Sequence, residues 1–119
     1  DIIDGKIINV AVSYTVVSDL KFSQFEILQR CNSEVEVYMS QFRDFGEPLY
    51  ISDIYKVLNA VQGVVDTKKV DIILREGGNY SVGFYDISNN TVDGRYVVCP
   101  SDSVFELKYP NTDIIGSVA

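Results

Sequence analysis

Carboxylates are the side chains in this sequence that could do acid–base chemistry, because its 119 residues include 17 Asp and Glu but no His. A pair such as Glu34 and Glu36 has the composition of the paired acids that hydrolyse glycosides. The two residues straddle a helix face, however, and such acidic side chains are ordinarily solvated. Without His, neither a Ser–His nor a Cys–His nucleophile pair can form. We therefore predict no catalytic residue and expect that the protein is not an enzyme.

Motifs that bind metals or phosphate are also absent from the sequence. Cys31 and Cys99 lie far apart and outside any CxxC motif, and we interpret both as structural thiols. Gly77-Gly78 precedes a strand pattern, whereas a phosphate cradle precedes a helix. Segment 86–93 is rich in Asp and Asn but lacks the ligand spacing and the closing Glu of a calcium loop. The sequence predicts no metal, no cofactor and no small-molecule substrate.

Charge and hydropathy restrict the partners. The net charge is −7 and the ten basic residues are scattered, so no basic stripe could follow a phosphate backbone. No apolar run approaches the ~18 to 20 residues of a membrane span. We therefore expect neither nucleic acid nor a membrane as a partner. Length and composition fit one domain over residues 1–119, which we expect to be a C-terminal fragment of a longer polypeptide.

Hydrophobic periodicity predicts a strand followed by a long helix. From Lys6 to Val17 every second residue is apolar, which is typical of a strand with one buried face. Between Phe22 and Phe42 the apolar residues recur every three or four positions, as in one amphipathic helix. Poor helix formers at Cys31-Asn32-Ser33 could kink that helix. The predicted helical stripe is Phe22, Phe25, Leu28, Cys31, Val35, Tyr38 and Phe42.

A second helix is predicted over residues 53–62. Ser52 is a natural N-cap, Asp53 favours the first turn, and Gly63 suits the left-handed position just past the C-terminus. Pro48 holds the preceding chain extended. The predicted buried face consists of Ile54, Val57, Leu58 and Val61.

The second half of the chain reads as strands. Alternation of Val70, Ile72 and Leu74 with more polar residues predicts a half-buried strand. Segments 80–87 and 94–98 look like the two arms of a hairpin that includes an Asp93-Gly94 turn. A last short strand is predicted over residues 103–109, and Pro110-Asn111 opens a tail.

These elements predict an α+β domain in which two helices pack on one face of a mixed sheet of four or five strands. The expected order is strand, helix, helix, strand, strand, strand, strand. The two helices are long enough to form a crossover that joins the first two strands in parallel, and such a crossover would be right-handed.

One face of the predicted sheet has a mixed composition. It carries too many apolar side chains to be exposed only to water, and too many polar ones to be buried in the core. Eight Tyr concentrate in the strands and the hairpin, and Tyr is common both in strands and at protein–protein interfaces. We predict that a partner covers this face. The candidate interface residues are Ile7, Ile73, Tyr80, Tyr85, Tyr96 and Tyr109.

Residues 48–64, which read PLYISDIYKVLNAVQGV, carry a family resemblance. Together with the strand and helix before them and the VDTKKVDI strand after them, they resemble the C-terminal region of baseplate J-like proteins of contractile-tailed bacteriophages. The similarity is best over residues 7–73. The end of the chain, PSDSVFELKYPNTDIIGSV, looks like the closing strand of the same family, and T-even-like wedge proteins are the preferred match.

This resemblance implies a structural protein of the virion without enzymatic activity. Its copies would join one another and other wedge proteins in a ring around the tail hub, after assembly in the host cytoplasm. The hairpin over residues 77–99 is longer than in the simplest members, and a subfamily-specific contact is expected there.

The alternative hypothesis is a small-ligand-binding regulatory module of ferredoxin-like type, since such modules also place two helices on a mostly antiparallel sheet. It would need a pocket with convergent polar groups at a subunit boundary. No such set of residues is visible in the sequence.

The assembly hypothesis makes a direct prediction about the candidate interface. Ile73→Asp or Tyr85→Asp should leave the monomer folded but abolish self-association, because a buried unpaired charge opposes contact between copies. Light scattering measures the oligomer mass, and an unchanged mass in both variants would argue against this choice of face.

Overall fold

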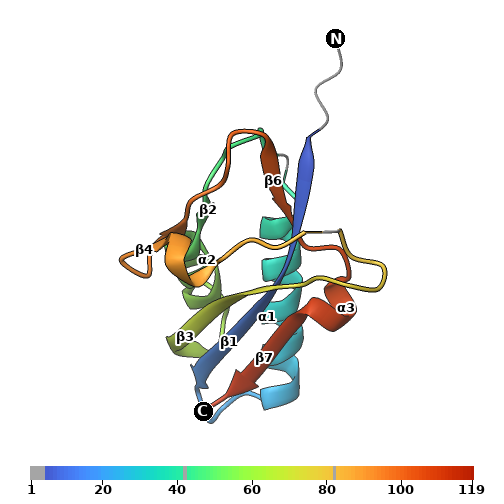
Figure 1. Ribbon diagram of the computed structural model, residues 1–119. Helices are drawn as coiled ribbons and strands as arrows, with labels where there is room; N and C mark the ends of the chain where they lie inside the picture. The colour runs from blue at the N-terminus through green and yellow to red at the C-terminus, as the bar shows by residue number, and fades with distance from the viewer. Residues whose placement is uncertain (1–4, 42, 82) are drawn as a thin grey trace.

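The computed structural model describes residues 5–41, 43–81 and 83–119. Over these residues the chain is an α+β fold with three α-helices, a mixed sheet of four strands and a second, smaller sheet (Figure 1). The elements are β1 (Lys6–Ser18), α1 (Gln24–Met39), β2 (Leu49–Tyr50), α2 (Ile51–Asn59), β3 (Val64–Leu74), the 3-10 turn η1 (Ser88–Asn90), β4 (Thr91–Val92), β5 (Tyr96–Val97), β6 (Ser103–Glu106), α3 (Pro110–Asp113) and β7 (Ile114–Val118).

β1 is the central strand of the larger sheet. It pairs with β3 in the antiparallel sense on one side. On the other side it pairs in parallel with β6 through Lys6 to Asn9 and with β7 through Val12 to Val16. The two short strands therefore occupy successive halves of the same edge, and the chain between them, residues 107–113, loops away from the sheet.

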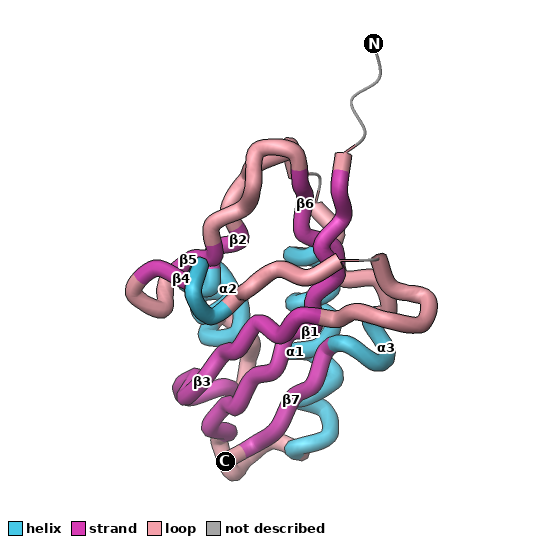
Figure 2. The backbone as a smooth tube through the Cα atoms, viewed as in Figure 1, coloured by secondary structure: helices cyan, strands magenta, loops and turns pink. Residues whose placement is uncertain are grey.

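Two helices cover one face of this sheet, where α1 packs against β7 and α2 against β3 (Figure 2). The predicted inner face of β1 is confirmed, because all five of its residues are buried in one core with residues from both helices. The Tyr14 hydroxyl donates to Asn32 Oδ1 at 2.6 Å, which satisfies a buried polar group at the middle of α1. The inner-face residues of β1 are Ile8, Val10, Val12, Tyr14 and Val16.

The parallel crossover that was considered for the first two long strands is wrong, because β1 and β3 are antiparallel. A strand followed by two helices returns the chain to the end of the sheet that it left. The Asp19 N–H donates to the Gly63 carbonyl at 2.8 Å and closes this loop. Gly63 has φ +97°, so the left-handed conformation expected after the second helix is present.

Both predicted helices exist, with corrected faces and ends. α1 is one unbroken α-helix, and its fully buried stripe is Ile27, Cys31, Val35 and Met39, whereas the predicted Phe25 is exposed. Phe42 lies outside the described residues. α2 begins at Ile51, before the expected Ser52 cap, and Tyr50 occupies the N-cap position. Of the predicted inner residues of α2, only Val57 is not fully buried.

The predicted long hairpin is only half correct. Residues 80–87 form no strand in the part of the chain that the structure describes, and the hairpin consists of β4 and β5 alone. Its loop has three residues, in which Asp93 at φ 53° and Gly94 at φ 67° are the central residues of a β-turn. The Arg95 N–H closes this turn by donating to the Val92 carbonyl at 2.8 Å. β2 adds a third strand to this small sheet by pairing with β5.

The segment after Pro110, predicted as a tail, is instead α3 followed by β7, a strand of the main sheet. The Tyr14 ring lies against Gly116 of β7, in the space that a Cβ at this position would fill. Glycine at position 116 therefore allows the edge strand to approach the core.

Because the Cys31 thiol of α1 is buried, we predict that the free energy of unfolding decreases at alkaline pH. Burial raises the pKa of Cys31 from 9.0 to about 11, so between these values the folded state retains a proton that the unfolded state has lost. Stability should therefore be full below pH 9 and fall as the pH rises towards 11, by about 1 kcal/mol per pH unit for this group.

Urea unfolding at several pH values measures this slope. Cys31→Ala should weaken the protein at neutral pH but show a shallower decline between pH 9 and 10. Burial also raises the pKa of Tyr14, but Tyr14 is present in both proteins, so the difference between the two slopes reports the thiol. Equal slopes in the two proteins would contradict the assignment.

Candidate functional site

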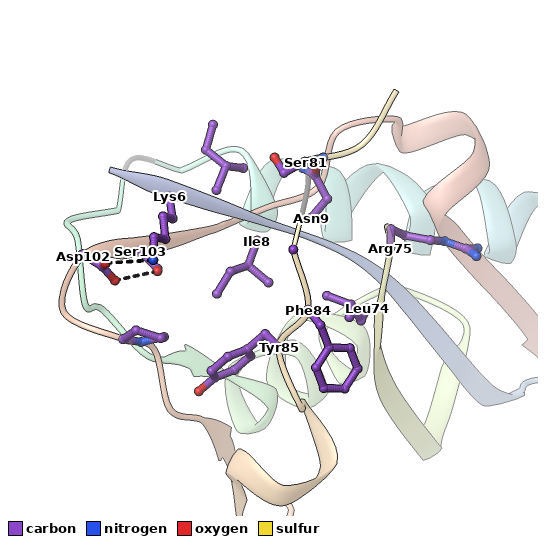
Figure 3. A pocket seen from close by; sticks show the side chains of 13 residues that line it. Lys6, Ile8, Asn9, Leu74, Arg75, Ser81, Phe84, Tyr85, Asp102 and Ser103 are labelled. Atoms are coloured by element: carbon purple, nitrogen blue, oxygen red, sulfur yellow. Dashed lines mark hydrogen bonds and ion pairs between the residues drawn. The ribbon is translucent and has the colours of Figure 1, made fainter. Parts of the chain in front are cut away.

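A cleft of about 290 Å³ opens between the N-terminal half of β1, the start of β6 and the segment around Phe84 (Figure 3). Its lining combines apolar side chains such as Ile8 and Leu74 with polar ones such as Lys6 and Asp102. The lining residues are Lys6, Ile7, Ile8, Asn9, Leu74, Arg75, Ser81, Gly83, Phe84, Tyr85, Pro100, Asp102 and Ser103.

The polar groups of the cleft are bound to one another. Asn9, only 1% exposed, donates to Glu106 Oε1 at 2.9 Å and accepts the Ser81 N–H at 2.7 Å. At the other end, Asp102 accepts the Ser103 hydroxyl and pairs with Lys6 at 3.6 Å. The hydrogen bond from Ser103, and then the Lys6 charge, hold the pKa of Asp102 below its usual value. Among the described residues no buried polar side-chain atom lacks a partner.

Large apolar side chains around the cleft and around a hollow beside it remain accessible. Phe84 is 74% exposed, Ile7 43% and Ile73 38%. Ile73, Phe84 and Tyr85 also line a shallower hollow next to the cleft, on the end of β3. Together these residues form an apolar rim, which we define as Ile7, Ile73, Phe84 and Tyr85.

The structure divides the six predicted interface residues among three places. Ile7, Ile73 and Tyr85 lie in the apolar rim. Tyr80 and Tyr109 contact each other edge to face, with ring centroids 5.5 Å apart. The remaining residue, Tyr96, packs on Tyr50 of the small sheet at 5.8 Å.

Tyr85 is a structural residue as well as a rim residue. Its ring packs against Phe105 at 6.1 Å, and its hydroxyl donates to the Val98 carbonyl. Burial raises the pKa of its phenol. Phe84 is not among the predicted interface residues, because the sequence predicts a strand for its segment. The available signal was a large aromatic residue directly after a glycine.

A buried carboxylate fixes the chain behind the cleft. Asp113 is 0% exposed and accepts hydrogen bonds from Arg75 Nε at 3.1 Å and from the Tyr80 hydroxyl at 2.9 Å. The Arg75 N–H donates in turn to the Asn9 carbonyl at 2.8 Å. Desolvation, and then Asp113, raise the pKa of Tyr80. This cluster joins the end of β3, the segment around Tyr80 and α3, and it has no accessible side from which a substrate could approach the carboxylate.

No metal centre is visible in residues 5–41, 43–81 and 83–119, where no three His, Cys, Asp or Glu side chains are grouped to hold an ion. Cys31 and Cys99 are both buried and unpaired with each other, in agreement with the structural interpretation. None of the helices in the same residues has the length and apolar character needed to cross a membrane.

In comparisons with known proteins, no family model and no curated protein matches the chain.

The buried ion pair predicts a stability difference between two aspartates. Asp113→Asn should cost about 2–4 kcal/mol of unfolding free energy, because it leaves Arg75 without its buried partner. Asp71 pairs with Lys69 at 3.1 Å on the surface, and Asp71→Asn should cost less than about 1 kcal/mol. Denaturant unfolding at neutral pH measures both, and equal costs would show that the buried cluster does not hold the loop.

Proposed function

We propose that this chain is a structural domain of a contractile phage tail baseplate. It joins copies of itself and other wedge proteins into the ring around the tail hub, in the virion. The observation that carries the proposal is the apolar rim, which leaves Ile7, Phe84 and Ile73 accessible around the cleft and the hollow beside it.

The cleft has the size and chemistry of a site for one inserted side chain of a protein partner. Interfaces draw most of their binding energy from a few apolar or aromatic anchors that fill such pockets, with polar groups around them. Here Phe84 and Ile73 supply exposed apolar area, while the Lys6–Asp102 pair lies at the cleft. A partner side chain placed against Ile8 would lie beside Phe84 and Tyr85 of the rim.

The chemistry of the described residues supports assembly over the two other functions considered. Asp113, the only fully buried carboxylate among the described residues, is closed to substrate. The polar groups of the cleft bind each other, which leaves few groups free to recognise a small polar ligand of the kind that a regulatory module binds.

The baseplate assignment itself comes from the resemblance over residues 7–73. The strand, two helices and returning strand of that match correspond to β1, α1, α2 and β3. These elements carry most of the core, so the resembling segment contains the main packing unit of the domain.

Oligomer mass tests this function. We expect the mass of the purified chain, measured by light scattering, to rise with concentration, and Ile73→Asp to shift it to the monomer. Leu20→Asp is the matched control, because Leu20 is 95% exposed and lies away from the rim. We use Ile73→Asp alone, because Tyr85→Asp would also remove packing on Phe105 and so would not leave the fold intact.

If the chain is a monomer at every concentration, this domain does not self-associate, and that part of the proposal is wrong. Heat on titration with amino acids or nucleotides would favour the ligand-binding module instead.

A further inference from the structure

The two long edges of the main sheet have different chemistry. The outer edge strand β3 carries exposed charges at Asp66, Lys68 and Lys69, together with a register shift against β1. Such features protect an edge from pairing with another chain. The opposite edge strand, β7, reads IIGSV and has no charge, no proline and no register shift.

The backbone of β7 has hydrogen-bonding groups that point away from β1. The Ala119 N–H, just past the end of β7, donates to the Val16 carbonyl of β1 at 2.9 Å. The backbone N–H and C=O groups of the odd-numbered residues at this end therefore point towards β1. Because N–H and C=O groups alternate in direction along a strand, Ile115 and Ser117 also face β1. The groups of Ile114, Gly116 and Val118 therefore point outward, and β1 is the only strand partner of β7 in the described chain.

A polar groove of about 680 Å³ lies beside the start of this edge, between α1 and α3. α1 packs against β7, as Figure 1 shows, so a strand added beyond β7 would lie under the outer flank of α1. With 3.6 residues per turn, Gln29, Asn32 and Glu36 share the flank on this side. The residues that line the groove are Glu26, Gln29, Arg30, Asn32, Ser33, Glu34, Glu36, Pro110, Asn111 and Ile114.

The groove is acidic, because three Glu face one Arg among its lining residues. Arg30 lies 3.7 Å from Glu26, so it offsets mainly that carboxylate. Glu36 is exposed and makes no ion pair in the part of the chain that the structure describes. Every second side chain of an added strand would point towards this flank.

We propose that β7 accepts an extended segment of another polypeptide as an additional strand, with Lys or Arg side chains directed at the acidic flank of α1. Main-chain hydrogen bonds to Ile114, Gly116 and Val118 supply the attachment, and Glu36 favours the basic sequence. The inference rests on the proposed assembly function and names the chemistry of one partner. A second copy of this chain fits less well, because its own acidic α1 flank would meet the first across the joined edges.

Titration with synthetic peptides tests the proposal. The probe is a peptide of about six residues that alternates Lys with Val and Thr, and its matched control has Glu in place of Lys. We expect the Lys peptide to bind about threefold to tenfold more tightly than the Glu peptide. One or two exposed ion pairs supply a difference of this size. NMR should show the amides of Ile114, Gly116 and Val118 shifting and becoming protected from hydrogen exchange.

Two protein variants separate the edge from the flank. Val118→Pro removes an outward N–H without removing a donor to β1, and it should abolish binding while circular dichroism stays unchanged. Glu36→Gln should weaken binding of the Lys peptide, whereas Glu76→Gln, an exposed acid outside the groove, should not.

The proposal is overturned if the peptide at millimolar concentration leaves the β7 amides unchanged, or if the Lys and Glu peptides bind equally. A dimer of the chain that Val118→Pro dissociates would overturn it too, because a second copy would then occupy the edge. If the chain self-associates through Ile73 but ignores the peptide, this inference fails and the assembly function stands.

Discussion

Strand β1 is the constraint on which the main sheet depends, because each of the other three strands forms its hydrogen bonds with it. Its inner side chains also supply the middle of the core between the two helices. Tyr14 contributes to both roles, since its ring lies against Gly116 of β7 and its hydroxyl bonds to Asn32 of α1. A change at this position would therefore affect one sheet edge and one helix together.

The split of the second edge into β6 and β7 explains the surface features. Between these strands the chain leaves the sheet, and buried Asp113 fixes its return through Arg75 and Tyr80. The N-terminal half of β1 is then left beside the cleft and its apolar rim, while β7 presents a short neutral edge near α1. The loop between β6 and β7 thus separates two surfaces, the apolar rim and the edge of β7. The rim suits contact between side chains, whereas the edge suits hydrogen bonding between backbones.

Local sequence signals predicted the elements that form the main packing unit. Alternation marked β1 and β3, and the three-to-four spacing marked α1 and α2, because these periods reflect burial of one face of each element. The errors lie where pairing is not local. Segment 80–87 has the composition of a strand, but its described residues, 80, 81 and 83–87, pair with no strand, and the Ser81 N–H donates instead to the Asn9 side chain. The sequence predicts a tail where β7 lies, because the five uncharged residues Ile114–Val118 give no periodic signal strong enough to show their pairing with a strand about 100 positions earlier.

The sequence by itself determined the composition of the site region and the α+β class. It predicted no His-based chemistry, and it named Ile7, Ile73 and Tyr85, which lie together in the rim. Only the tertiary structure decided that Tyr80, Tyr96 and Tyr109 lie elsewhere, that Phe84 is exposed, and that Asp113 is buried against Arg75. The physical reason is that periodicity reports which face of an element is buried. The partners of each element, and the surfaces left between them, depend on contacts between residues far apart in the chain.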